Sequence, residues 1–128
     1  MRAADAFAFV TPEYNHSPSP ALVNALDYLS SEWHYKPAAF VSYGGVSGGL
    51  RAAQMTRLIV VGLRMMPIPE NISIQHYAQY LDEEKTFTPP AQIVASVEPM
   101  LDELHKWAES LKALRTRPSA SCGPGGPR

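Results

Sequence analysis

Two polar loops carry the residue types that could bind a ligand. The first, residues 11–15 (Thr-Pro-Glu-Tyr-Asn), follows an apolar run at residues 6–10 and precedes a helix start at Ser19. The second, residues 42–49 (Ser-Tyr-Gly-Gly-Val-Ser-Gly-Gly), follows the apolar run 38–41 and also precedes a helical pattern. Ligands of open α/β sheets bind in the crevice at the carboxyl ends of the strands. Loops of this kind after neighbouring parallel strands therefore predict one shared crevice.

Each loop also has a plainer interpretation. The first is compatible with a polar connection in which Asn15, Ser17 and Ser19 satisfy backbone groups. The second is compatible with a helix-entry loop in which glycine relieves crowding. It matches neither Gly-x-Gly-x-x-Gly nor the P-loop, because Leu50 and Arg51 follow its last glycines. From the residues alone, these alternatives stay open.

The order of the motifs resembles a known family. Residues 11–17 (Thr-Pro-Glu-Tyr-Asn-His-Ser), 24–27 (Asn-Ala-Leu-Asp) and 36–38 (Lys-Pro-Ala) lead into Ser42-x-Gly44-Gly45-x-x-Gly48-Gly49-x-Arg51. This series is similar to the flavodoxin-like NAD(P)H-dependent FMN reductases, which include many quinone, azo-dye and chromate reductases. The resemblance runs from about residue 3 to about residue 114.

The resemblance implies FMN and NAD(P)H as cofactors. Hydride would pass from reduced nicotinamide through FMN to a quinone, azo compound, metal oxyanion or flavin. It also implies that the first loop wraps the flavin and the second approaches the ring from the other side. The expected cofactor-binding residues are Thr11, Pro12, Glu13, Tyr14, Asn15, Ser42, Tyr43, Gly44, Gly45 and Val46.

Neither a catalytic residue nor a metal ligand is predicted. Hydride transfer between nicotinamide and flavin needs no protein base, so Glu13 is assigned to hydrogen bonding or charge placement. The N-terminus of the helix after the second loop is expected to favour the negative charge of reduced flavin or of a nicotinamide phosphate. Arg51 is equally compatible with a ligand contact there and with a solvated position. The four histidines are scattered, and none lies in a His-Glu-x-x-His motif.

The fold implied by the resemblance is α/β and flavodoxin-like, a parallel sheet with helices on both faces. Family members carry an earlier strand, a Gly-Ser-x-Arg phosphate-binding loop, a helix and a further strand before the point that corresponds to Met1. We therefore expect an N-terminally truncated domain at residues 1–114 with strands 3-4-5 of the family order and weak FMN binding, which brings activity into question. The alternatives are a non-catalytic remnant or assembly module unable to hold FMN, and an electron carrier that uses no nicotinamide.

The first half of the chain alternates strand and helix patterns. Residues 6–10 are apolar throughout, which is typical of a strand covered on both faces. Ser19 and Pro20 predict the start of a helix that ends before Pro37. Residues 38–43 are predicted as the next strand. The following helix is expected to bury the stripe Ala52, Met55, Ile59 and Leu63.

The second half is less regular. Residues 64–68 predict a short strand, which Pro67 and Pro69 restrict to a sheet edge or an irregular end. Residues 71–87 are interpreted as an irregular excursion. A long helix from Pro90 carries the stripe Ile93, Val97, Met100, Leu104, Trp107, Leu111 and Leu114. Residues 115–128, rich in Pro, Gly and Ser, predict a disordered tail.

Composition narrows the functional class. The 128 residues carry a net charge of −1, which gives no basic footprint for nucleic acid. The longest apolar stretch, residues 58–63, is too short to span a membrane. The single cysteine, Cys122, favours a cytoplasmic location. We expect a homo-oligomer, because residues 6–10 would form an unprotected sheet edge and expose Phe7 or Phe9 to water.

Overall fold

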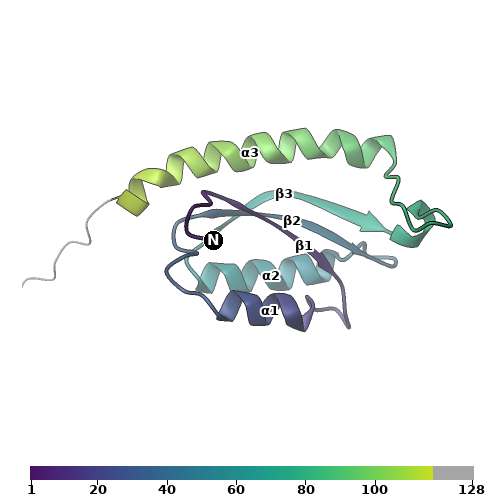
Figure 1. The fold of residues 1–128 in the computed structure, drawn as a ribbon, viewed down its shortest axis with the longest axis horizontal. Helices are drawn as coiled ribbons and strands as arrows, with labels where there is room; N and C mark the ends of the chain where they lie inside the picture. The colour runs from purple at the N-terminus through teal and green to yellow at the C-terminus, as the bar shows by residue number, and fades with distance from the viewer. Residues whose placement is uncertain (117–128) are drawn as a thin grey trace, which may run out of the picture.

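The computed structural model describes residues 1–116, which are organised by a parallel sheet of three strands (Figure 1). The elements in chain order are β1 (Phe7–Pro12), α1 (Pro20–Asp27), β2 (Pro37–Gly44), α2 (Leu50–Gly62), β3 (Met66–Gln75), the 3-10 turn η1 (Tyr77–Tyr80) and α3 (Ala91–Thr116). The strand order is β1-β2-β3, and both neighbouring pairs are parallel. Helices α1 and α2 cover one face and α3 covers the other, so the predicted α/β class is confirmed.

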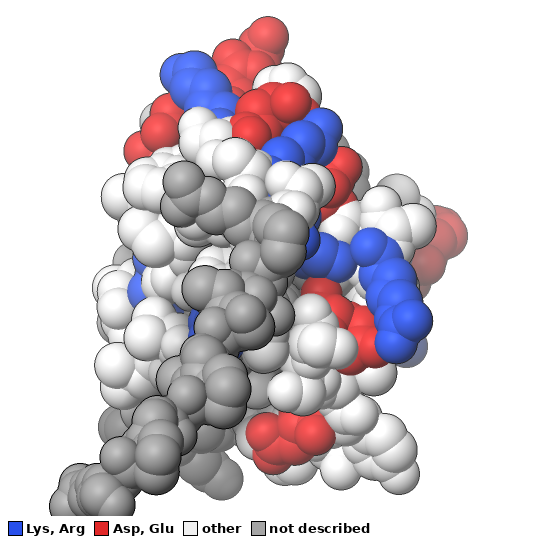
Figure 2. All heavy atoms as spheres, turned by 90° about the vertical axis from the view of Figure 1, so that its left-hand side faces the viewer, with Lys and Arg blue, Asp and Glu red and all other residues white. Residues whose placement is uncertain are grey.

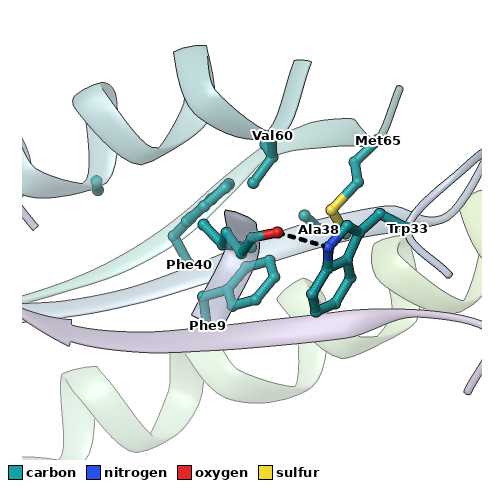
Figure 3. Close-up of a cluster of buried hydrophobic side chains, with 8 residues drawn as sticks. Phe9, Trp33, Ala38, Phe40, Val60 and Met65 are labelled. Atoms are coloured by element: carbon teal, nitrogen blue, oxygen red, sulfur yellow. Dashed lines mark hydrogen bonds between the residues drawn. The ribbon is translucent and has the colours of Figure 1, made fainter. Parts of the chain in front are cut away.

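The larger core lies between the sheet and helices α1 and α2 (Figure 3). Trp33, in the turn before β2, donates its indole N–H to the Leu26 carbonyl at 2.9 Å. Its ring packs edge-on against Phe7, with the centroids 4.9 Å apart, and also against Phe9. Phe9 is therefore buried, and the expectation that it would meet water is wrong. The other buried members are Leu26, Ala38, Phe40, Ala53, Val60 and Met65.

The opposite face is covered over only part of its width. Helix α3 packs Met100 and Leu104 against Ile72 and other side chains of β2 and β3. Strand β1 lies beside β2 at the sheet edge, and its Val10 is 64% exposed on this face. The prediction that both faces of this strand are covered is therefore wrong. Within residues 1–116, β1 lies at an edge of the sheet, as the expectation of an oligomer assumed.

Helices α1 and α2 begin as predicted. Ser19 caps α1 by accepting a hydrogen bond from Leu22 N at 3.3 Å, and Pro20 follows it. In α2 the buried residues are Ala52, Ala53, Thr56 and Val60. Met55 is 45% exposed, so the predicted stripe was about one position out of phase. Leu58 and Val61 also face solvent, which explains the error, because apolar residues lie on more than one side of this helix.

Strand β3 is longer than predicted. It runs over Met66–Gln75, so residues 71–75, interpreted as irregular, belong to the sheet. Pro67 and Pro69 lie where the register against β2 shifts, between Ala38 and Phe40. The guanidinium of Arg57 donates to the carbonyls of Ile68 and Pro69 at 2.5 and 3.2 Å. These bonds satisfy backbone acceptors beside the irregularity and let the strand continue beyond it.

Helix α3 also extends past its predicted end at residue 114. Arg115 lies in the helix and donates to the Tyr35 carbonyl at 3.0 Å and to Asp5 Oδ1 at 2.6 Å. Figure 2 shows this end of the molecule, where basic and acidic side chains are interspersed. The rest of the predicted tail, residues 117–128, lies outside the described residues. Within residues 1–116, no helix is long and apolar enough to cross a membrane.

Candidate functional site

Three loops meet at the carboxyl ends of the strands. Because residues 11–12 belong to β1 and residues 42–44 to β2, the first loop in the structure is residues 13–18 and the second loop is residues 45–49. Residues 76–80 follow β3, and we call them the third loop. Glu13 N donates to the Tyr43 carbonyl at 3.1 Å, and His76 N donates to the Gly45 carbonyl at 3.0 Å. Each outer loop is thus hydrogen bonded to the central strand or loop, as the prediction of one shared crevice requires.

The first loop ends in a tight turn. Tyr14 and Ser17 exchange backbone hydrogen bonds of 2.9 and 3.0 Å. The two residues between them, Asn15 and His16, have φ angles of 49° and 67°. Asparagine tolerates this left-handed region better than most residues, which explains its place in the turn. The turn presents Tyr14, Asn15 and His16 to solvent.

The two last glycines of the second loop are required by the fold. Gly48 and Gly49 have φ angles of 60° and 79°, and a Cβ on Gly49 would lie 2.7 Å from Tyr43 N. The Gly48 carbonyl accepts hydrogen bonds from the hydroxyls of Ser42 and Ser73 at 2.9 and 3.0 Å. These contacts bury the base of the loop against the strand ends.

The tip of the second loop is open. A Cβ added to Gly45 would meet no atom within 4 Å. Val46 is 77% exposed. The backbone N–H groups of Val46 and Ser47 donate to no acceptor within residues 1–116. Two hydrogen-bond donors and an apolar side chain are therefore available here to a ligand.

One carboxylate joins the first loop to helix α2. Glu13 Oε2 accepts hydrogen bonds from Ser47 Oγ at 2.9 Å and from Arg51 N at 3.1 Å, and Glu13 Oε1 accepts one from Arg51 Nε at 2.7 Å. Arg51 Nη2 also forms an ion pair with this carboxylate, whose side chain is only 7% exposed. The hydrogen bonds and charge of Arg51, with a smaller contribution from Ser47, hold the pKa of Glu13 below its usual value despite desolvation.

The expectation for the N-terminus of this helix therefore changes. Arg51 N is an amide of the first turn of α2, and its acceptor is Glu13, where the negative charge of reduced flavin or of a nicotinamide phosphate was expected. The Arg51 guanidinium is likewise paired with Glu13 and does not lie free in solvent. Both charges that the sequence offered to a ligand are engaged with each other.

The third loop adds a wall that the sequence interpretation missed. Tyr77 packs edge-on against Tyr43, with the ring centroids 5.1 Å apart. A pocket of about 250 Å³ is lined by Gly44, Gly45, His76, Tyr77, Ala78 and Gln79. A second, apolar pocket of about 320 Å³ is lined by Val10, Val41, Tyr43, Ile74, Tyr77, Leu81 and Phe87. The alternation of Ile72 and Ile74 was the available signal that a third strand would deliver this loop to the crevice.

The predicted site residues fall into three groups. Thr11 and Ser42 are fully buried, so their side chains support the strand ends. Pro12, Glu13 and Gly44 are partly buried between the first and second loops, and Tyr43 lines the apolar pocket. Tyr14, Asn15, Gly45 and Val46 are exposed at the two loop tips. All four residues of this last group are exposed to a ligand.

Comparisons with known proteins identify the family. Residues 1–79, which contain all three strands and both predicted loops, match the model of the NADPH-dependent FMN reductase family. The chain therefore belongs to the NADPH-dependent FMN reductase family, as the motif resemblance predicted. The predicted cofactors, FMN and NAD(P)H, agree with the description of this family.

Several relatives carry related names. An NAD(P)H-dependent FMN reductase of Saccharomyces cerevisiae is 40% identical over 86 residues, which cover 56% of this chain and 44% of that protein. One of Schizosaccharomyces pombe is 54% identical over 55 residues, or 43% of this chain and 28% of that protein. Other relatives are named quinone reductase and azoreductase. The chain thus spans less than half the length of these two yeast relatives.

A solved structure shares the fold. The flavoenzyme NAD(P)H:(acceptor) oxidoreductase from Paracoccus denitrificans superposes with a TM-score of 0.65 at 24% identity. The match covers 85% of this chain and 63% of that one. The likeness confirms the predicted flavodoxin-like class.

Proposed function

We propose that the crevice between the first and second loops binds FMN and serves an NAD(P)H-dependent reductase. The observation that carries this proposal is the open tip of the second loop. Gly45 leaves space where a side chain would stand, beside two unused N–H donors. A planar ring with heteroatoms at its edge fits this combination of close backbone approach and directed donors.

The residues present fit a flavin in stated roles. The N–H groups of Val46 and Ser47 would donate to ring heteroatoms, and Tyr14 would supply an aromatic wall from the first loop. When bound, FMN supplies the hydride chemistry, which needs no protein acid or base. The protein contributes binding and orientation, and the third loop with Tyr77 and His76 bounds the space beside Gly45.

The acceptor is proposed from the relatives. Their names include quinone reductase and azoreductase, which supports a small, aromatic electron acceptor. We therefore place quinones and azo compounds first, with metal oxyanions and free flavin as further acceptors.

Native mass spectrometry and an NADPH oxidation assay test the proposal. FMN bound to the purified protein, with quinone-dependent consumption of NADPH or NADH, is the expected result. Bound FMN without nicotinamide oxidation would instead favour an electron carrier.

A non-catalytic assembly module is the second candidate. The uncovered face of β1 at Val10 favours it. Protein that takes up no FMN from a saturating solution, yet is folded by circular dichroism, would establish this alternative over the reductase.

A further inference from the structure

We infer that Glu13 is a positioning residue, which holds the first loop against the first turn of α2 and thereby sets the width of the flavin crevice. The inference rests on the proposed function for the identity of the ligand. The contacts themselves are independent of it.

The Glu13 contact joins an exposed turn to a helix that is anchored on the sheet. Helix α2 is anchored on the sheet through the buried residues Ala52, Ala53, Thr56 and Val60. Within residues 1–116, the donors to the Glu13 carboxylate are Ser47 in the second loop and Arg51 in the first turn of that helix. The first loop itself exposes its turn residues Tyr14, Asn15 and His16. The carboxylate is therefore the side-chain contact that ties this exposed turn to the rigid helix.

The contact of Glu13 with Ser47 and Arg51, which we call the clamp, consists of charge-assisted hydrogen bonds. Charge-assisted hydrogen bonds are shorter and stronger than neutral ones, and the Arg51 fork fixes direction as well as distance. Arg51 Nη2 also donates to Ser47 Oγ at 3.3 Å, which closes the network. The side chain of Glu13 is only 7% exposed, whereas that of Arg51 is 50% exposed, so water reaches this network from the Arg51 side.

The clamp adjoins the residues that are proposed to contact the flavin on both sides of the crevice. Glu13 immediately precedes Tyr14 in the first loop, and Ser47 directly follows Val46 in the second. The proposed flavin contacts are thus next to the clamped residues or on them: Tyr14 follows Glu13, and the N–H groups of Val46 and Ser47 lie beside the Ser47 hydroxyl in the chain. A loosened clamp would let the two walls separate without any change in the residues that touch the ring.

Hydrogen exchange and FMN titration of Glu13→Gln test the inference together. We expect the amides of Tyr14, Ser17 and Arg51 to exchange at least tenfold faster than in the wild type, while the amide of Phe40 in β2 stays unchanged. The dissociation constant for FMN should rise at least fivefold. Glu32→Gln is the matched control, because Glu32 is paired with Arg2 near the other end of the sheet. It should change neither quantity.

A double-mutant cycle separates positioning from a direct contact of Arg51 with FMN. If Arg51 acts through Glu13, Arg51→Ala should weaken FMN binding in the wild type but have little further effect in Glu13→Gln. Additive effects would overturn the inference, as would unchanged exchange in Glu13→Gln. If Glu13→Gln fails to fold, Ser47→Ala removes one donor and keeps the ion pair. A rise in exchange of about threefold is then expected, and no rise would contradict the clamp.

The two proposals fail in different ways. A wild-type protein that binds no FMN refutes the proposed function, and the exchange rates then decide the clamp alone. A wild type that binds FMN, with the same affinity in Glu13→Gln, refutes the positioning role and leaves the function standing.

Discussion

At the scale of single residues, the glycines near the second loop differ in what requires them. The positive φ and close contacts of Gly49 require glycine, whereas Gly45 faces open space. The sequence has four glycines in residues 44–49 but does not distinguish these two cases, because they depend on atoms that other parts of the fold bring near. Gly45 is thus the position at which the fold tolerates a side chain and the proposed ligand does not.

Thermal unfolding of two variants tests this distinction. Gly45→Val should leave the melting temperature unchanged, because a Cβ at this position meets no atom within 4 Å and the loop tip is exposed. Gly49→Ala should lower it by several degrees, because its Cβ would lie 2.7 Å from Tyr43 N at a φ of 79°. A similar loss for both variants would show that the tip of the second loop is packed in solution.

The ionisation of Glu13 predicts a dependence of stability on pH. Its pKa is lowered in the folded protein, chiefly by the hydrogen bond from Arg51. The unfolded chain therefore takes up this proton first as the pH falls, starting near the usual glutamate pKa of about 4.3. The stabilisation by Glu13 is fully present above that pH and is lost as the pH falls through the lowered value.

Melting temperatures of the wild type and Glu13→Gln should differ by a constant amount from pH 6 to pH 8. The difference should shrink below a pH of about 4.3, as the carboxylate is protonated. The comparison cancels the other carboxylates, which both proteins share. A difference that persists unchanged at pH 3 would show that the charge of Glu13 is not what stabilises the loop.

At the scale of elements, the parts with clear signals were predicted well. The strand at residues 38–43, the start of α1 at Ser19 and the long helix from residue 90 all have a regular period or a cap. The first residues of β3 lie in the predicted strand 64–68, but residues 71–75 were missed because Pro67 and Pro69 indicated that the strand would be short. The contacts of Arg57 with the Ile68 and Pro69 carbonyls, which let the strand continue, are formed only after folding.

The sequence predicted part of the candidate site, as it predicted part of the sheet. Both loops after regular strands were located, whereas the third loop was lost with β3. The pairing of Glu13 with Arg51 spans 38 residues of sequence, so no local pattern could show it. The sequence therefore indicated which residues approach the crevice but not which of them are already engaged.

Ile72→Ala tests the extended strand. Ile72 is buried between β3 and α3, and truncation of such a side chain costs about 2–4 kcal/mol of unfolding free energy. Val94→Ala, at a position of α3 that is 55% exposed, is the control and should cost less than about 0.5 kcal/mol. Denaturant unfolding measures both. Equal small losses would mean that residues 71–75 are not packed as a strand.

At the scale of the whole molecule, the sheet has an incomplete side. Val10 and Val41 lie in register on neighbouring strands and line the apolar pocket beside α3. Further along the same face, a groove of about 670 Å³ is lined by Ile93, Val94, Val97 and Leu101 of α3. Parallel sheets are normally covered on both faces. An uncovered edge strand favours association with another chain.

Sedimentation at low micromolar concentration tests association. The wild type should sediment above the mass of one 14.0 kDa chain. Val10→Lys should shift it toward the monomer, because a charge on an edge strand opposes pairing. Leu58→Lys, at an exposed position on α2 on the other face, should not. A wild type that is a folded monomer with cooperative unfolding contradicts this prediction.

Titration of the protein with FMN, followed by quenching of flavin fluorescence, tests the central claim that the two loop tips form a flavin site. The account predicts saturable quenching at one FMN per chain in the wild type. It also predicts at least a tenfold higher dissociation constant in Gly45→Val, whose melting temperature is expected to match that of the wild type. Quenching that does not saturate, or equal affinity in the two proteins, would contradict the claim.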